Sequence, residues 1–174
     1  MNHNDHYVPQ SILRNFHNTD DRLHVFDKWK EREFVSSTRN VASEKGFYDF
    51  PTGYGVIPFE PMLTDVENRA LKPIRSIIET RSLNGLSETE RENVAFFLAV
   101  QMMRTRAARD MLAQMDEGLR AILPNKNLTE SQMPEGTFFA DDDELKAASI
   151  SHLSIAQHTY PHLLTKEWSL KTQN

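Results

Sequence analysis

The chain has 174 residues, a net charge of −5 and no cysteine, which fits one domain that folds without disulfides. The missing cysteines exclude a zinc–thiolate site and a cysteine nucleophile. The negative charge disfavours generic coating of nucleic acid, which needs a surplus of lysine and arginine. The longest apolar run, 94–100, is far shorter than the roughly 20 residues of a membrane span. We therefore expect a cytoplasmic protein with no membrane partner, and no cofactor can be named.

Residues 6–60 predict a docking segment, a hairpin and a loop. Pro9 fixes the backbone for the first turn of a short helix that runs to about Phe16. Two β-rich runs, "LHVFDKW" and "EFVSS", flank the charged turn "KERE" and predict a β-hairpin over 22–37. Glycine and proline punctuate "PTGYGVIPFEP", which predicts a loop.

Residues 61–123 predict a pair of helices. In the first, over 61–80, apolar residues recur at spacings of three and four, as expected for one buried face. The second begins at a capping box, Ser87 with Glu90 three residues later, and continues to residue 123, before Pro124. Its middle, "VAFFLAVQMM", is apolar nearly all round and predicts the most buried helix.

Residues 124–174 predict a mobile polar linker over 124–142, then a helix from 143 that stops near Pro161. The closing "TKEWSLKT" alternates apolar and polar residues and is compatible with a strand. The sequence therefore predicts a mainly α-helical single domain over 1–174, with a small N-terminal β-hairpin as its β component.

Several polar side chains fall where apolar ones are expected. At about 100° per residue, Glu67 lies within the apolar stripe of its helix, Gln101 lies in the middle of the next stripe, and Arg104 flanks it. In the opening segment Gln10 and Arg14 share one helical face. A polar group that faces a core needs partners. We therefore expect these residues to meet in one polar network.

The network has two interpretations. In the first it is structural, an ion pair and amides that fix how the N-terminal segment docks. In the second it is a ligand pocket, where the two arginines clamp a phosphate or carboxylate, His6 moves protons and Glu67 acts as a base or metal ligand. His158 and His162 have the spacing of a metal pair on a helix, but Pro161 lies between them, so no metal site is predicted.

The segment "HYVPQSILRNF" resembles the opening signature of the bacterial domain of unknown function 4238 family. The resemblance continues through "LHVFDKW", "TRNVASEKGFYDF", "DVENRALKPI" and "LSETERENVAFFLAVQMMRT", and covers most of residues 6–106. Because the family has no established activity, the resemblance implies a fold rather than a reaction. The positions that match its recurrent polar signature are His6, Gln10, Arg14, Asn15, Asp27, Asn40, Tyr48, Glu67, Gln101 and Arg104.

Family members continue past a segment like "TKEWSLKT" into a strand and a turn resembling Ser-Asp-Asn-Pro. This sequence ends earlier, which predicts either a fragment of a longer protein or a naturally short version.

Two functions follow from these residues. The first is a nuclease-like hydrolase of a phosphate-bearing substrate, with His6 and Glu67 as catalytic residues. Its ligand-binding residues would be Gln10, Arg14, Asn15, Gln101 and Arg104. The alternative is a non-catalytic module that binds a protein or small ligand and uses the polar network as a structural element. Solvent access separates the two, because a catalytic set must line a cleft open to water.

Overall fold

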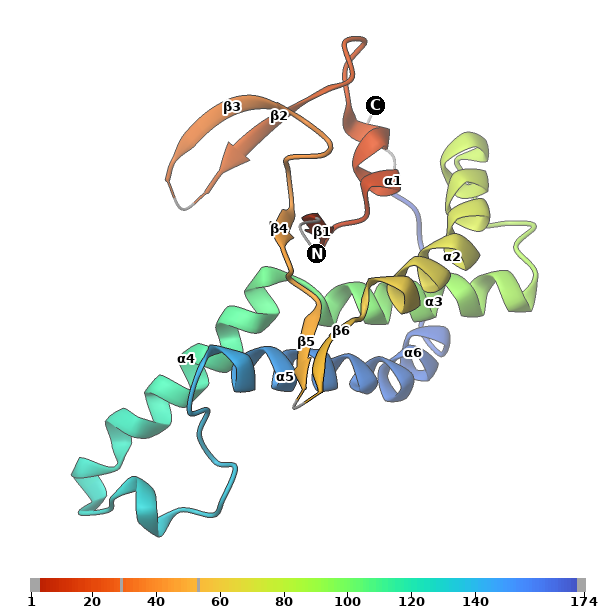
Figure 1. Cartoon of the computed structure of the whole chain (residues 1–174). Coiled ribbons are helices and arrows are strands. Elements are labelled where there is room, and N and C mark those ends of the chain that lie inside the picture. Colours follow the sequence, from red (N-terminus) through yellow and green to blue (C-terminus); the bar gives the residue numbers. More distant parts are fainter. Residues whose placement is uncertain (1–3, 29, 53, 172–174) are drawn as a thin grey trace. The chain divides into compact units, whose positions relative to one another are not determined.

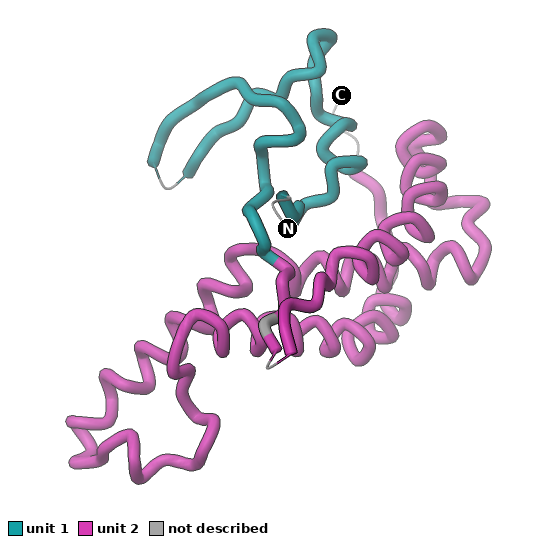
Figure 2. The backbone as a smooth tube through the Cα atoms, viewed as in Figure 1, with its two compact units in different colours: residues 1–47 teal, residues 48–174 magenta. Residues whose placement is uncertain are grey.

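The computed structural model describes residues 4–28, 30–52 and 54–171. The chain divides into two compact units, Met1–Phe47 and Tyr48–Asn174, which are coloured separately in Figure 2. Short antiparallel strand pairs and one helical turn build the first unit, and helices build most of the second. The fold is therefore mainly α with a minor β component, which confirms the predicted fold class.

In the first unit, β1 (Asn4–His6) pairs with β4 (Ser43–Lys45), and α1 (Gln10–Leu13) follows Pro9 and continues into η1 (Arg14–Phe16). β2 (Arg22–Asp27) and β3 (Arg32–Ser37) form the hairpin predicted over 22–37. Trp29, which ends the predicted strand "LHVFDKW", lies outside the described residues.

The second unit opens with a hairpin of β5 (Asp49–Thr52) and β6 (Gly55–Pro58), in which Phe50 lies opposite Ile57. The prediction of a plain loop here is wrong. Gly55 adopts φ +127°, a conformation that glycine takes at little cost. The hydroxyl of Thr52 donates to the Gly55 carbonyl at 2.6 Å. Glycine therefore marks the turn of a hairpin in this segment.

The core of the second unit lies around α3 (Glu88–Met103), which packs against α2 (Glu60–Thr80) and α6 (Ala156–Leu164), as Figure 1 shows. The predicted capping box is confirmed, because the Ser87 hydroxyl accepts from the Glu90 backbone N–H and the Glu90 carboxylate accepts from the Ser87 N–H. Buried side chains of α3 are Val94, Ala95, Phe97, Ala99 and Val100.

The long helix predicted from Ser87 to Leu123 is wrong, because the chain breaks it in two. α3 ends at Met103, and α4 (Arg106–Ile122) begins after Thr105. Thr105 has an extended backbone, with ψ 154°, and its hydroxyl accepts from the Ala108 N–H at 3.2 Å. This N-cap satisfies a donor that the helix start leaves without a backbone partner. Arg104 consequently lies at a corner between two helices.

After two short 3₁₀ turns, η2 (Pro124–Lys126) and η3 (Glu130–Gln132), the chain forms α5 (Asp142–His152), η4 (Leu153–Ile155) and α6. The prediction that Pro161 ends the last helix is wrong, since α6 continues to Leu164. Proline removes one N–H donor from a helix, but the Pro161 carbonyl still accepts from the Thr165 N–H at 3.3 Å.

The strand expected at "TKEWSLKT" is also wrong, because its described residues, up to Lys171, have no strand partner. The Trp168 indole donates to the Leu163 carbonyl at 2.8 Å, and the Arg91 guanidinium lies 4.6 Å from the indole centroid. Among the described helices, none has the length and apolar character to cross a membrane.

Candidate functional site

A buried polar cluster forms at the α3–α4 corner. The Arg104 guanidinium donates to the Glu67 carboxylate at 2.6 Å and to the Tyr48 hydroxyl at 3.1 Å. The Tyr48 hydroxyl in turn donates to the Arg104 backbone carbonyl at 3.0 Å. The Arg104 side chain is only 1% exposed, and that of Glu67 is 21% exposed. The cluster therefore joins α2, the start of β5 and the corner through one arginine.

Burial and charge act together on this cluster. Burial raises the pKa of Tyr48 to about 12, even though the charge of Arg104 lowers it. Burial alone would lower the pKa of Arg104, but Tyr48 and Glu67 outweigh it, so the Arg104 pKa lies above its usual value. At neutral pH Tyr48 is consequently a neutral hydroxyl and Arg104 a cation. Neither group exchanges protons in that range.

Two further charged side chains act on Tyr48. The charge of Glu60 raises the Tyr48 pKa and that of Arg109 lowers it. Helix periodicity does not predict Tyr48, Glu60 or Arg109 as site residues. Tyr48 is marked only by its place in the polar signature of the family resemblance, and no sequence pattern marks Glu60 or Arg109.

A second polar group lies in the first unit, around Thr38. The His6 Nε2 atom is 3.2 Å from the Thr38 carbonyl oxygen. The Gln10 amide donates to the Thr38 hydroxyl at 3.3 Å, and the Gln10 carbonyl accepts from the Arg14 guanidinium at 2.9 Å. The structure thus brings together three of the predicted site residues.

Asn15 has a local role, because its amide donates to the Ser11 and Ile12 carbonyls at 3.2 and 3.0 Å. Gln101 is half-buried on α3, one turn before Arg104. Glu67 and Arg104, both expected in the polar network, are in direct contact. Since His6, Gln10 and Arg14 belong to the other unit, the single network that joins both groups stays a prediction.

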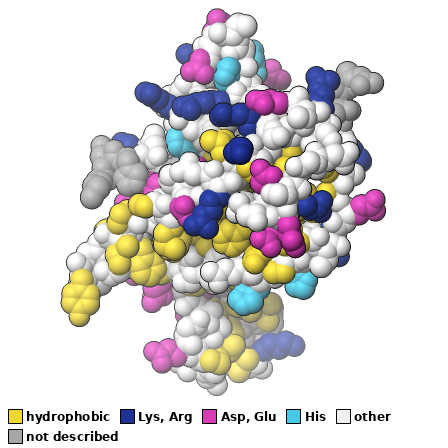
Figure 3. Space-filling model, turned by 90° about the vertical axis from the view of Figure 1, so that its right-hand side faces the viewer, with side chains coloured by type: hydrophobic (Ala, Val, Ile, Leu, Met, Phe, Trp, Pro, Cys, Tyr) yellow, Lys and Arg dark blue, Asp and Glu magenta, His cyan; other side chains and the backbone are white. Residues whose placement is uncertain are grey.

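A large pocket lies within the second unit, between the β5–β6 hairpin, α2, α3 and the α5–α6 segment. Its volume is about 1220 Å³. Figure 3 shows hydrophobic side chains gathered along the hairpin and beyond it, and the exposed side chains there include Val56, Ile57 and Met62. We call this cavity the apolar pocket. It is lined by Phe50, Ile57, Phe59, Pro61, Met62, Leu63, Asp65, Val66, Arg69, Glu92, Asn93, Phe96, Val100, Ile150, Ser151, Leu153, Ser154, Gln157 and Tyr160.

Aromatic contacts shape the wall of the apolar pocket. The rings of Phe96 on α3 and Tyr160 on α6 meet edge to face, with centroids 5.4 Å apart. At the rim, Arg69 pairs with Asp65 at 2.6 Å. In the described part of the chain, no group of three or more histidine, aspartate and glutamate side chains is placed to hold a metal ion.

Comparison with known proteins gives one match. A family model described as "Protein of unknown function (DUF4238)" matches residues 4–174, which confirms the resemblance seen in the sequence. No curated protein and no solved structure matches the chain.

Proposed function

The chain belongs to the DUF4238 family, whose description assigns no activity, and we propose that it is a non-catalytic binding module that holds an apolar ligand in the apolar pocket. The observation that carries this proposal is the pocket itself. Its volume of about 1220 Å³ is slightly larger than the roughly 300–1,000 Å³ of ordinary small-molecule sites. Phe96 and Tyr160 supply the aromatic lining that such sites favour.

The polar groups of the pocket suit a ligand with an apolar body and a polar end. Ser151, Ser154 and Gln157 come from the α5–α6 side, and α2 and α3 add Asp65, Arg69, Glu92 and Asn93. Hydroxyl and amide groups bind a polar end by hydrogen bonds, since each can donate and accept. The apolar walls gain free energy by removing the ligand body from water.

The buried cluster around Arg104 supports this proposal because it holds elements of the second unit together. Arg104 already donates to Glu67 and Tyr48 and is sealed from water. A phosphate clamp needs an arginine whose donors reach the substrate. The cluster is therefore better suited to holding α2 against the α3–α4 corner, and α2 also forms one wall of the apolar pocket.

Blocking the pocket tests the proposal. The probe is anilinonaphthalene sulfonate, a dye that fluoresces in apolar sites. Ser151→Trp places a large ring in the pocket, whereas Ser76→Trp is the matched control, an exposed helical serine outside the lining. We expect the chain and Ser76→Trp to bind the dye, and Ser151→Trp to lose affinity by about tenfold, or roughly 1.4 kcal/mol, at an unchanged melting temperature. Equal binding by all three proteins would overturn the proposal.

A nuclease-like hydrolase of a phosphate-bearing substrate is the second candidate. It is favoured by the hydrogen bonds that link His6 and Gln10 to Thr38 and Arg14 to Gln10. An imidazole can transfer protons and a guanidinium can hold an anion. In this function His6 acts on the substrate, and Gln10 and Arg14, which belong to the same unit, hold it.

The test of this candidate is hydrolysis of bis(p-nitrophenyl) phosphate with Mg²⁺ or Mn²⁺ supplied. We expect His6→Ala to abolish that hydrolysis while the melting temperature stays unchanged. If the native chain shows no hydrolysis above background, this candidate is excluded.

A further inference from the structure

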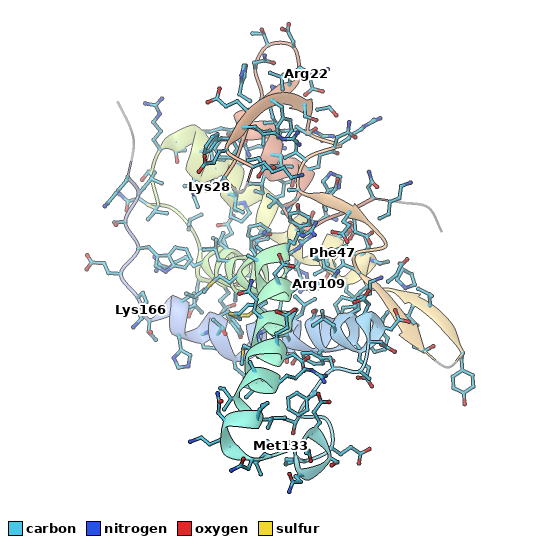
Figure 4. The ribbon with its side chains drawn as sticks, turned by 90° about the vertical axis from the view of Figure 1, so that its left-hand side faces the viewer. Arg22, Lys28, Phe47, Arg109, Met133 and Lys166 are labelled. Atoms are coloured by element: carbon cyan, nitrogen blue, oxygen red, sulfur yellow. The ribbon has the colours of Figure 1, made fainter. Side chains whose placement is uncertain are left out.

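Helix α4 turns an apolar stripe to solvent. Met111, Met115, Leu119 and Ile122 are 48%, 58%, 41% and 52% exposed. Their spacings of four, four and three place them along one face of the helix. Figure 4 shows α4 running from Arg109, near its start, toward the loop that carries Met133. Flexible methionines on an exposed face are typical of surfaces that bind other proteins.

The opposite face of α4 is polar, and it is this face that the rest of the unit covers. Asp116 accepts from the Phe139 backbone N–H at 3.0 Å and from Arg120 at 2.9 Å. Arg120 donates to the Phe139 carbonyl at 2.9 Å and also pairs with Glu130. An amphipathic helix usually buries its apolar face. In α4 the polar face has internal partners, and the apolar stripe lies open.

The stripe belongs to a longer pattern. Ala108, Met111, Met115, Gly118 and Ile122 follow one another at spacings of three, four, three and four, as in the seam of a coiled coil. The residues that flank this seam are uncharged: Ala107, Leu112, Gln114, Leu119 and Ala121. Every charged residue of α4 lies on the other positions: Arg106, Arg109, Asp110, Asp116, Glu117 and Arg120. Burying the seam therefore requires no charged side chain to leave water.

We propose that a second copy of this chain covers the stripe, with the two α4 helices antiparallel. In this register Met111 faces Ile122 of the other copy, and Met115 faces Gly118. The large side chain of Met115 then packs against Gly118, which has no side chain. The space beside Gly118 is open, since a Cβ there would meet no atom within 4 Å. A parallel pair would instead place Gly118 against Gly118 and leave a gap, which packed interfaces avoid.

Charge supports the same orientation. The first turn of α4 contains Arg106 and no acidic residue, although the positive end of a helix dipole disfavours a cation. In the proposed register Ile122 of an antiparallel partner lies opposite Met111, so the negative C-terminal end of the partner lies much nearer this turn than it would in a parallel pair. In a parallel pair the two positive ends and both Arg106 side chains would lie together, which is unfavourable.

The interface is small. α4 has 17 residues and is thus about 25 Å long. One helix face of that length buries less than the roughly 800 Å² per partner of a standard interface. We therefore expect dimers that form reversibly as the protein concentration rises.

Cysteine cross-linking tests the register directly, because the chain has no cysteine of its own. Met111→Cys and Ile122→Cys are prepared separately and oxidised alone and as a mixture. In the proposed register these two positions face each other, whereas two Met111→Cys residues lie 11 positions, or about 16 Å, apart. A disulfide needs Cα atoms within about 7 Å, so we expect the mixture to give at least about tenfold more covalent dimer than either variant alone. Ser76→Cys on α2 is the control for random collisions.

A second variant tests the apolar contact itself. Met115→Glu should remove the concentration-dependent rise in mass seen by light scattering, and Ser76→Glu, at another exposed helical position, should keep it. Melting temperatures of both should match the native chain. Abundant dimer from Met111→Cys alone would overturn the antiparallel register. A native chain that stays monomeric at millimolar concentration and gives no cross-link would overturn the dimer, and the stripe would then belong to a different partner.

Discussion

The arginine–carboxylate clusters around Arg104 and around Arg120, both in the second unit, differ in burial. Arg104 is sealed at the α3–α4 corner and reaches Glu67, which lies 37 residues earlier in the chain. Arg120 is half-exposed and pairs with Asp116, one turn before it on the same helix, and with Glu130 in the following loop. The chemistry is the same in both, but the first cluster joins helices that are distant in sequence, and the second orders a neighbouring loop.

This difference predicts unequal effects on stability. A buried ion pair that loses one partner leaves a charge without compensation in a poorly solvated place. Exposed pairs contribute little, because water screens them and the side chains lose conformational entropy when they are held. Stability should therefore depend strongly on the cluster at Arg104, while the cluster at Arg120 should mainly affect the local order of residues 124–141.

The largest expected effect comes from breaking the Arg104 pair. Glu67→Gln and Arg104→Met should each lower the free energy of unfolding by roughly 3–5 kcal/mol, measured by chemical denaturation. The double variant should recover much of the loss, because no unpaired charge then stays buried. Arg120→Met is the matched control and should leave the midpoint almost unchanged. Additive losses in the double variant would show that Glu67 and Arg104 do not depend on each other.

A smaller effect on stability is expected at alkaline pH. It distinguishes the Arg104 cluster from the Arg120 cluster, because only the Arg104 cluster contains a tyrosine. Burial raises the pKa of Tyr48 from 10.0 to about 12. The folded state therefore holds this proton longer than the unfolded state, so the resulting stability is complete below pH 10 and is lost as pH rises toward 12. Tyr48→Phe should remove this part of the pH dependence.

Absorbance of tyrosinate gives an independent measurement. One tyrosine of the native chain should ionise about two pH units after an ordinary one, and Tyr48→Phe should lack that late step. Tyr54→Phe is the control, since Tyr54 is fully exposed at the tip of the β5–β6 hairpin. If Tyr54→Phe removed the late step and Tyr48→Phe kept it, the buried cluster would be placed around the wrong residue.

The sequence predicts those parts that depend on periodicity over many residues. The α2 span, the Ser87 capping box and the hairpin over 22–37 each follow from several residues that favour the same element. The need of Glu67 for a cation also follows, because its position within an apolar stripe is fixed by helix geometry. The structure supplies that cation as Arg104, which donates to Glu67 at 2.6 Å.

The sequence could not predict features that depend on one residue's backbone. Thr105 is compatible with a helix interior, and the apolar pattern continues beyond it, so the α3–α4 break depends on a cap that periodicity does not reveal. Gly55 indicates a turn but does not say that the segments on each side pair. Tyr48 joins Arg104 across 56 residues, a long-range contact that no local pattern encodes. The link from His6, Gln10 and Arg14 to Glu67 stays a prediction, because these residues belong to different units.

The smallest expected effect comes from the half-exposed cluster around Arg120 at acid pH. The Arg120 side chain, by its hydrogen bond, and the Phe139 N–H lower the pKa of Asp116 below its usual 3.8. Because this carboxyl has a lower pKa in the folded state, its ionised form stabilises the folded loop at pH values above the ordinary aspartate pKa. This contribution is lost as pH falls below about 4. Amide hydrogen exchange of residues 124–141 should therefore be several-fold faster in Asp116→Asn than in the native chain at pH 6, a change of at most about 1 kcal/mol in local opening. The difference in exchange rate between Asp116→Asn and the native chain should shrink as the pH is lowered toward 3.

The control for this last prediction is Asp110→Asn, which removes the carboxylate of another exposed pair on α4, at 3.8 Å from Arg106. Asp110 pairs with Arg106 on its own helix, so exchange in the 124–141 segment should stay at the native rate. The denaturation midpoint should be nearly the same for both variants and the native chain, because Arg106 and Asp110 are exposed and Arg120 is half-exposed. If Asp116→Asn lowered global stability as much as Arg104→Met, the distinction between a helix-joining and a loop-ordering cluster would be wrong. Equal acceleration by Asp110→Asn would assign the loop's order to the general charge of α4 instead of the contact between Asp116 and Phe139.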